Sequence, residues 1–346
     1  MHCSLPPVND GISMSNPLIT FVVCAYNQEQ FIREAVAAAL DQTYSPLEVI
    51  LSDDCSPDRT FEIMQEMAAA YRGPHQVVLN KNPKNLGVGG HVNRIFELSR
   101  GELVVGAAGD DISFKDRTER VYRAWVESSQ TAFSIYSNMI VIDSIGSEKG
   151  VWNDGSIASH PPSCAVAVAW GDAGVYGCSH AFHRKTFDIF GPMDDRVVHE
   201  DEAIPFRSLL LGTIKYLDEP LVYYRRHENN LWTYPSTAPT LQKRCQILSS
   251  DWSYLVSWLR DLRRAGFLGI IAHDECERLQ QEVVERLREK SVESQFYNSP
   301  LPAALLVLFR EYLGRKTFRQ MIRLLKRRWQ SERAACGHPR TTSQLH

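Results

Sequence analysis

Two pairs of adjacent acids in this 346-residue chain follow short apolar runs. Asp53 and Asp54 follow VIL, and Asp110 and Asp111 follow LVVGA, with each run predicting a buried strand. Open α/β sheets bind ligands beyond the carboxyl ends of their strands, so we expect both pairs at one edge of a sheet. A single Asp would be read as a helix cap or an ion-pair partner, but two adjacent pairs favour a ligand site.

A third acidic cluster, Glu200–Glu202, precedes a stretch with helical spacing of apolar residues. Such a cluster could be a charged helix cap, or it could contain a general base. Downstream, Arg225, Arg226 and His227 offer cations for phosphate and an imidazole for a metal. Because a divalent cation takes one or two carboxylates plus substrate phosphates, the strand-end acids could hold one.

The composition limits the class of protein. The net charge of −3 argues against a nucleic-acid-binding polycation, and 44% hydrophobic with 23% charged residues is ordinary for a globular chain. The eight cysteines form no CxxC pair, which favours a reducing compartment. We see no secretory signal and no run of about 18 apolar residues that could span a membrane. These features predict a cytoplasmic protein, at most peripheral to a membrane.

The order of predicted elements indicates the fold. Strands and helices alternate, which predicts an α/β fold with a Rossmann-like, mixed and mainly parallel sheet flanked by helices. The predicted strands are 18–25, 49–51, 76–79, 103–107, 133–141 and 214–224, and the predicted helices of this part are 28–42, one from about Thr60, and 89–100, with Gly101 as its C-cap.

The last third of the chain has a different pattern. Ranges 241–264, 273–291 and 303–330 read as helices without a strand between them. We therefore divide the chain into a flexible tail (1–16), a catalytic domain (17–235), a C-terminal all-helical extension (240–330) and a second tail (331–346), with the boundary in Tyr234–Pro239.

Two further stretches have open interpretations. Gly87-Val-Gly-Gly90 suggests a dinucleotide loop, but it follows the third strand rather than the first, which favours a tight turn with close packing. The irregular segment 150–195 holds Trp152, Trp170 and His180. These residues could bind an acceptor sugar or belong to the core.

A series of ordered motifs closely resembles the inverting GT-A glycosyltransferases of family 2. The motifs are ITFVVCAYNQEQFIREAVAAALDQTY, LEVILSDDCSPDRT, NLGVGGHVNRIFELSRGELVVGAAGDD, HEDEAIPFRSLLLG and YRRH, and the resemblance covers about Pro17 to Trp232. It implies a nucleotide-diphosphate-sugar donor (UDP-, GDP- or dTDP-linked), Mg²⁺ or Mn²⁺, and single displacement at the anomeric carbon by a hexosyltransferase. It also implies a hydroxyl of a glycan or lipid-linked acceptor, in cell-surface polysaccharide or glycan synthesis.

The resemblance assigns roles by position. Tyr26 would stack on the base, Asp54 would hydrogen-bond it, and Asp201 would be the catalytic base, paired with Glu200. The remaining residues implied for the donor are Ala25, Asn27, Asp53, Asn85, Asp110, Arg225 and Arg226, and those implied for the metal are Asp110, Asp111 and His227. The chain departs from the family's Asp-x-Asp motif at Ala108, so Asp111 or His227 would have to compensate.

Two other functions stay open. A nucleotidyltransferase could use the same cradle, but CAYNQEQ lacks the basic loop that a triphosphate needs. A degenerate nucleotide-sugar-binding or scaffold protein would explain Ala108, although the intact Glu200–Asp201 pair argues against it. No nucleic-acid partner is expected.

The segment 301–330 combines apolar residues with eight basic residues and one acid, Glu311. This pattern suits a helix at an anionic membrane interface on the cytoplasmic face, or a helix packed on the catalytic domain with a solvated basic face. The basic residues are Arg310, Arg315, Lys316, Arg319, Arg323, Lys326, Arg327 and Arg328.

Overall fold

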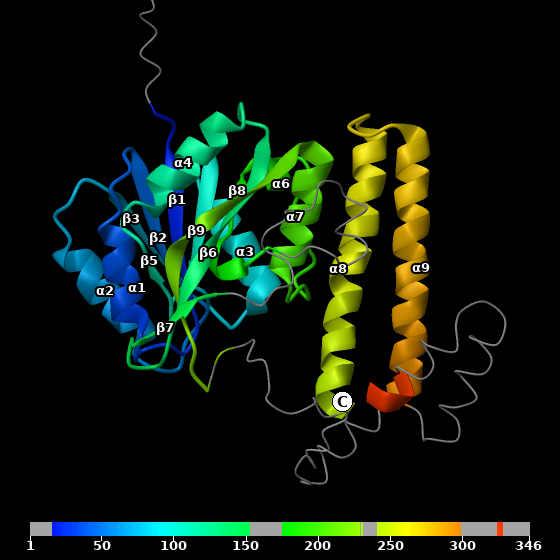
Figure 1. The fold of residues 1–346 in the computed structure, drawn as a ribbon. Coiled ribbons are helices and arrows are strands. Elements are labelled where there is room, and N and C mark those ends of the chain that lie inside the picture. The colour runs from blue at the N-terminus through cyan, green and yellow to red at the C-terminus, as the bar shows by residue number, and fades with distance from the viewer. Residues whose placement is uncertain (1–15, 153–174, 229, 231–240, 299–323, 328–346) are drawn as a thin grey trace, which may run out of the picture.

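The computed structural model describes residues 16–152, 175–228, 230, 241–298 and 324–327 (Figure 1). Its first half alternates strands and helices as predicted, in the order β1 (Ile19–Ala25), α1 (Ile32–Leu40), β2 (Leu47–Asp53), α2 (Thr60–Ala70), β3 (Gln76–Lys81), α3 (Gly87–Leu98) and β4 (Leu103–Ala108). The second half contains β5 (Ile112–Ser113), α4 (Arg117–Glu127), β6 (Ala132–Ile142), β7 (Glu148–Val151), the 3₁₀ turn η1 (Gly177–Ser179), β8 (Ala181–His183), α6 (Lys185–Asp188), α7 (Glu200–Leu211), β9 (Thr213–Arg225), α8 (Leu241–Phe267) and α9 (His273–Asn298).

The strands form one mixed sheet in the order β3-β2-β1-β4-β8-β6-β9-β5, with β7 paired to β6. Strands β3, β2, β1 and β4 are parallel, whereas β8 is antiparallel to both β4 and β6. In this register Ala25 pairs with Asp53, and Cys24 pairs with Ala108. The carboxyl ends of β1, β2 and β4 therefore meet at one edge, as expected for a ligand site.

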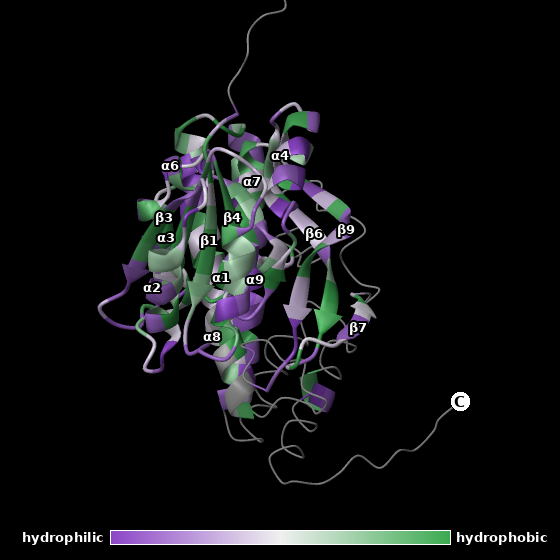
Figure 2. Ribbon diagram, turned by 90° about the vertical axis from the view of Figure 1, so that its left-hand side faces the viewer, coloured by the Kyte–Doolittle hydropathy of each residue, from purple (hydrophilic) through white to green (hydrophobic). Residues whose placement is uncertain are grey.

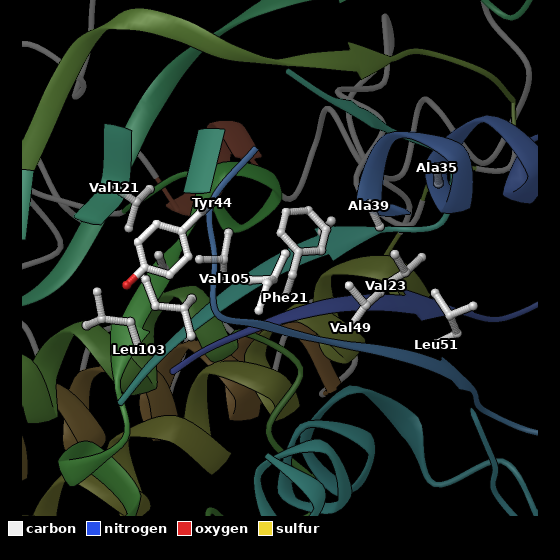
Figure 3. Close-up of a cluster of buried hydrophobic side chains, with 14 of the residues drawn as sticks. Phe21, Val23, Ala35, Ala39, Tyr44, Val49, Leu51, Leu103, Val105 and Val121 are labelled. Carbon is white, nitrogen blue, oxygen red and sulfur yellow. The ribbon is translucent and has the colours of Figure 1, made fainter. Parts of the chain in front are cut away.

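Helices cover both faces of the sheet. Along β1, Phe21 and Val23 enter one core and Val22 enters the other, because successive side chains point to opposite faces. Both faces of these strands are buried, which explains why the sequence shows continuous apolar runs. Helices α1, α2 and α4 pack on the first face (Figure 3). In Figure 2 the central strands β1 and β4 are mostly hydrophobic.

Helices α3 and α7 pack on the second face, α8 packs on α7, and α9 packs on α8 (Figure 1). The Phe206 ring of α7 stacks on Trp258 of α8, with centroids 4.5 Å apart. The Arg207 guanidinium binds the Asp261 carboxylate 2.7 Å away, and both side chains are almost fully buried. The hydrophobic core therefore continues without a break from the sheet into α8 and α9.

Two local expectations need comment. Gly87 has a φ of +71°, and a Cβ on Gly89 would lie 2.7 Å from the carbonyl oxygen of Val197, so the tight turn and close packing are confirmed. The prediction that Gly101 caps α3 is wrong, since Ser99 occupies the C-cap with φ −73°. Gly101 is needed for another reason: a Cβ there would lie 2.3 Å from the backbone nitrogen of Thr20.

Several sequence predictions lie outside the described residues. They include the tails, Trp170, the boundary at Tyr234–Pro239 and most of 303–330. Of that last range only Leu324–Arg327 are described; they are helical, and Leu324 packs against Phe296 and Tyr297 of α9. Among the described helices, none is long and apolar enough to cross a membrane.

Candidate active site

The two acids at the end of β2 are buried, and each accepts hydrogen bonds from a different segment of the chain. Asp53 accepts a hydrogen bond from the backbone N–H of Ser56 at 2.9 Å and another from its hydroxyl. Ser56 Oγ in turn accepts the N–H of Asn27 at 2.8 Å. Asp53 therefore fixes the turns that follow both β2 and β1, including Ala25 at the end of β1.

Asp54 holds the loop before α3. Its Oδ1 accepts N–H groups of Asn82 at 2.8 Å and Leu86 at 2.9 Å, and its Oδ2 accepts the N–H of Gly87 at 3.0 Å. A carboxylate has about four acceptor sites, so one lone pair on Oδ2 remains for a ligand. Asn85 is exposed in the same loop and accepts the N–H of Gly87 at 2.9 Å.

Tyr26 follows β1 directly and has an exposed side chain, 47% accessible, at this edge. An exposed aromatic face beside a carboxylate can stack on a planar group. The edge thus offers a stacking surface in Tyr26 and a hydrogen-bond acceptor in Asp54.

The end of β4 brings Asp110 to His227, which follows β9. The His227 Nε2 lies 3.0 Å from Asp110 Oδ2, and the Asn230 side-chain nitrogen lies 3.5 Å from the same oxygen. Gly109 permits the approach of this loop to β1, because a Cβ there would lie 2.8 Å from the Cβ of Ala25. One carboxylate and one imidazole thus lie within reach of a single ion.

Asp111 and Arg225 form a buried clamp beneath this pair. Asp111 Oδ1 accepts the backbone N–H of Arg225 at 2.8 Å, and burial raises the pKa of Asp111, with the charge of Asp110 adding to the rise. The Arg225 guanidinium donates to the Asp110 carbonyl oxygen at 2.9 Å and to Glu34 at 2.7 Å, and it lies over the Phe31 ring. Both side chains therefore hold the loop, and neither faces solvent.

Three acids begin α7 and are half-buried. Burial raises the pKa of Glu200 to about 8, with the charge of Asp201 adding to the rise, and burial raises the pKa of Asp201 to about 6. A Cβ on Gly177 would lie 3.1 Å from Glu200 Oε1 and 3.4 Å from Asp201 Oδ2, so η1 rests directly on these two carboxylates. Burial raises the pKa of Glu202 to about 8, and the charge of Asp201 adds to the rise; from the α8–α9 hairpin, Arg286 and Lys290 oppose the rise and Asp251 adds to it.

Two buried thiols lie within electrostatic range of all three acidic clusters. The pKa of Cys178 is raised by burial and by the charges of Asp111, Asp110 and Asp201, although Arg117 opposes the rise. The pKa of Cys24 is raised to about 12 by burial and by the charges of Glu200 and Asp54. The thiols act here as small apolar fillers between acids that are far apart in the sequence.

Few of the described side chains at this site could coordinate a divalent cation. Among the described residues no group of three or more His, Cys, Asp and Glu side chains could hold a metal ion. Asp110 and His227 nevertheless fit a cation that completes its coordination with phosphate oxygens and water, as Mg²⁺ and Mn²⁺ commonly do. Asp111 is engaged with Arg225 and lies behind this pair.

An aromatic cluster lies next to the site, and of its aromatic residues only Trp152 was singled out from the sequence. Trp152 packs edge-on against Tyr176 and Tyr224, and the exposed Arg226 guanidinium lies 4.8 Å from the Trp152 ring. His180, by contrast, is a core residue: it hydrogen-bonds Ser134 at 2.8 Å, and burial lowers its pKa to about 3.

Sequence reasoning missed Glu34, Asn230 and Gly177. Glu34 lies on α1 and pairs with Arg225 across 191 residues, for which the sequence gives no signal. Asn230 stands three residues after His227, so its proximity could have been proposed from the motif.

Comparisons with known proteins agree with this geometry. Residues 20–189 match the family model Glycosyl transferase family 2. An uncharacterized glycosyltransferase of Nostoc sp. is 25% identical over 222 residues, which are 61% of this chain and 66% of that protein. The chain spans between 44% and 66% of the lengths of the first curated relatives that it matches.

Solved structures share the fold at low sequence identity. S. aureus TarS 1-349 in complex with UDP-GlcNAc has a TM-score of 0.53 at 15% identity, with 92% of each chain covered. The mannosyltransferase PcManGT from Pyrobaculum calidifontis, in complex with GDP-Man and Mn²⁺, has a TM-score of 0.50 at 14% identity, with 94% of this chain and 88% of that one covered. The fold is of the GT-A type, and residues 20–189 of the chain match glycosyl transferase family 2.

Proposed function

We propose that this chain is an inverting glycosyltransferase that moves a hexose from a nucleotide-diphosphate sugar to a hydroxyl of a glycan or lipid-linked acceptor. The observation that carries the proposal is the shared environment of Cys178. Asp110, which pairs with His227, and Asp201, whose pKa is raised, both act on this one thiol. The packing also supports this, because η1 contacts Asp201 through Gly177 and packs against β4, the strand that leads to Asp110. The proposed leaving-group site and the proposed base would therefore lie near one another, as an in-line displacement requires.

The donor would bind along the edge of the sheet. The base stacks on Tyr26 and donates an N–H to the free lone pair of Asp54. Asp110 and His227 would hold Mg²⁺ or Mn²⁺, which supplies charge neutralisation for the diphosphate. Arg226 is exposed and can add a cation, whereas Arg225 is committed to Glu34 and the Asp110 loop. The relatives that bind UDP-GlcNAc or GDP-Man support a nucleotide-sugar donor.

Asp201 would accept the proton of the acceptor hydroxyl. The acceptor oxygen forms a bond to the anomeric carbon as the bond from that carbon to the diphosphate oxygen breaks, which inverts the configuration. Because burial raises the pKa of Asp201, the carboxylate is a stronger base than an exposed Asp would be. The Trp152–Arg226 pair lies where an acceptor sugar could contact an aromatic face.

A donor screen tests the function. The full chain is incubated with Mn²⁺ and with UDP-, GDP- or dTDP-sugars, and thermal unfolding and nucleotide release are measured. We expect one nucleotide class to raise the Tm through binding to the folded state. Binding without release of nucleotide in the presence of glycan acceptors would favour the non-catalytic alternative, which the single metal carboxylate keeps open. Turnover of a nucleoside triphosphate with a sugar 1-phosphate would favour a nucleotidyltransferase.

Replacing Asp110 with Ala should weaken donor affinity by at least about tenfold and remove its dependence on Mn²⁺, because the variant loses the metal's protein carboxylate. Calorimetric titration of the donor, with and without Mn²⁺, measures both effects. Asp188→Ala is the matched control, since that carboxylate pairs with Arg184 at the surface. Unchanged, metal-independent affinity in Asp110→Ala would contradict the metal assignment.

We also propose peripheral attachment to the inner face of the cytoplasmic membrane through the basic segment 301–330. The charge pattern supports this, at about 1 kcal/mol for each Lys or Arg near an anionic surface. The packing of Leu324 on α9 shows that part of the segment also contacts the protein. Co-sedimentation of the full chain with anionic and neutral vesicles is the test, and absence from anionic vesicles at low salt would exclude attachment.

A further inference from the structure

One buried histidine beside the donor edge has no role in the mechanism above. His91 lies in α3, is 6% exposed, and its Nε2 lies 2.7 Å from the Ser52 hydroxyl oxygen. Burial lowers the pKa of His91, although the charges of Asp54 and Asp53 oppose this. A buried imidazole that forms a hydrogen bond to a strand residue is usually structural, so its connections decide whether it does more.

The hydrogen bonds that start at His91 lead to Asp54. Asn80 of β3 donates one N–H to Ser52 Oγ at 3.0 Å and a second to Asn82 Oδ1 at 3.0 Å. Asn82 then donates to Asp54 Oδ1 at 2.8 Å. The Ser52 oxygen accepts from Asn80 and keeps its own hydrogen and a second lone pair for the hydrogen bond with His91 Nε2. Asn80 is therefore the donor in both of its hydrogen bonds, one leading to Ser52 and the other leading through Asn82 to Asp54.

The chain of bonds closes on the helix from which it started. Asp54 accepts the N–H groups of Leu86 and Gly87, which begin α3, and His91 lies in the first turns of that helix. Three elements, β2, β3 and α3, are thus joined by one ring of polar contacts. The described members of this ring are all buried except for the backbone of the α3 loop. This ring fixes the orientation of the Asp54 carboxylate, and with it the direction of the Oδ2 lone pair that remains for a ligand.

We propose that His91 is a positioning residue for the nucleotide: by its hydrogen bond with the Ser52 hydroxyl, it fixes the Asn80–Asn82 amides and hence the Asp54 carboxylate and the Leu86–Gly87 loop. This inference rests on the proposed function, in which the base of the donor binds at the end of β2. His91 does not touch the ligand. Its effect is on affinity, because the geometry of an acceptor four hydrogen bonds away, Asp54, determines how well the base is held.

Removal of the imidazole leaves the Ser52 hydroxyl without its buried hydrogen-bond partner. The hydroxyl must then rotate or admit water, and Asn80 loses the fixed acceptor that orients its amide. A loss of one buried hydrogen bond of this kind corresponds to roughly a tenfold change in an equilibrium constant. We therefore expect about a tenfold weaker Kd for the nucleotide in His91→Ala.

The experiment titrates UDP, GDP and dTDP separately into the full chain by calorimetry with saturating Mn²⁺, and follows thermal unfolding without nucleotide. The variants are His91→Ala, His91→Gln and Ser52→Ala. Gln places an amide close to the position of Nε2 and can accept the Ser52 hydroxyl, so it should restore most of the affinity. Ser52→Ala breaks the same bond from the other side and should weaken binding as His91→Ala does; the double variant should be no weaker than either single one.

His75 provides the matched control. It is similarly buried at 8% exposure and forms one ring hydrogen bond of 2.8 Å to the Gln42 carbonyl oxygen, at the opposite end of β3. His75→Ala should lower the Tm and leave the nucleotide Kd unchanged. This comparison separates a loss of stability from a loss of positioning.

The outcomes are distinct. A weaker Kd in His91→Ala and Ser52→Ala, rescued by His91→Gln and absent in His75→Ala, supports the proposal. If the wild type binds a nucleotide and His91→Ala and Ser52→Ala bind it equally well, His91 is structural and only this proposal is overturned. If the wild type binds none of the three nucleotides, the proposed function fails and this inference fails with it. Should His91→Ala not fold, the smaller change Ser52→Ala decides.

Discussion

Replacing Asp201 with Asn is expected to lower the rate of sugar transfer by about 10²- to 10⁴-fold and to leave donor affinity unchanged, because it removes only the proton acceptor. Asn has nearly the same shape as Asp, so the packing against Gly177 is retained. The raised pKa and the contact with η1 distinguish this carboxylate from an ordinary helix cap. Initial rates at saturating donor, together with calorimetric titration of the donor, measure the two quantities.

The neighbouring acids provide matched controls. Glu202 lies beside Asp201 and near charges of the α8–α9 hairpin, whereas η1 contacts Glu200 and Asp201, so Glu202→Gln should retain activity within about tenfold. Glu200 contacts η1 beside Asp201, and Glu200→Gln shows how far its charge supports the base. If Asp201→Asn transfers sugar within a few-fold of the wild type, Asp201 is not the base.

The assignment of Asp201 as the general base also determines whether kcat/KM rises or falls with pH. A general base works only when ionised, so wild-type kcat/KM should rise with pH through about 6, rather than through about 4 as for an exposed Asp. Glu200 and Asp201 interact, and the measured values therefore belong to the pair. The profile is recorded from pH 4 to pH 9 at saturating Mn²⁺, and a limb near pH 4 would contradict a buried base.

The first four strands and the acids that follow them could be predicted because the signal is local. A parallel strand buried on both faces must be an apolar run, and a polar residue placed at its carboxyl end stands out. Asp54 and Asp110 were recognisable for this reason. The exact element ends differed by a few residues, since helix and strand termini depend on contacts that periodicity does not contain.

The partners of the site residues could not be predicted, because they come from distant parts of the chain. Arg225 stands in a motif that suggests phosphate binding, yet the structure commits it to Glu34 and the Asp110 carbonyl. Strand β8 has only three residues and lies between β4 and β6, so it is too short to be predicted from a hydrophobic run in the sequence. Long-range pairing of this kind is set by tertiary packing, which also overrode the expected C-cap at Gly101.

The largest effect on stability is expected at the ion pair between α7 and α8. Arg207 binds Asp261 through two nitrogens at 2.7 and 3.2 Å and also donates to the carbonyl oxygens of Gly191 and Thr186. Burial raises the pKa of Asp261 and lowers that of Arg207, so desolvation acts on both partners. Asp261→Ala leaves a buried guanidinium without its counter-charge and should lower the free energy of unfolding by about 3–5 kcal/mol.

Urea unfolding followed by circular dichroism measures the change. Glu97→Ala is the control for an exposed pair: it breaks the contact with Arg94 on α3, and we expect a loss of less than about 1 kcal/mol. The double variant Arg207→Met/Asp261→Leu should recover most of the stability, because apolar side chains of similar volume avoid the desolvation cost. If Asp261→Ala is no less stable than Glu97→Ala, α8 is not integral to the core. A large loss that the double variant repairs would show that a chain ending before α8 cannot keep α7, and with it Asp201, in place.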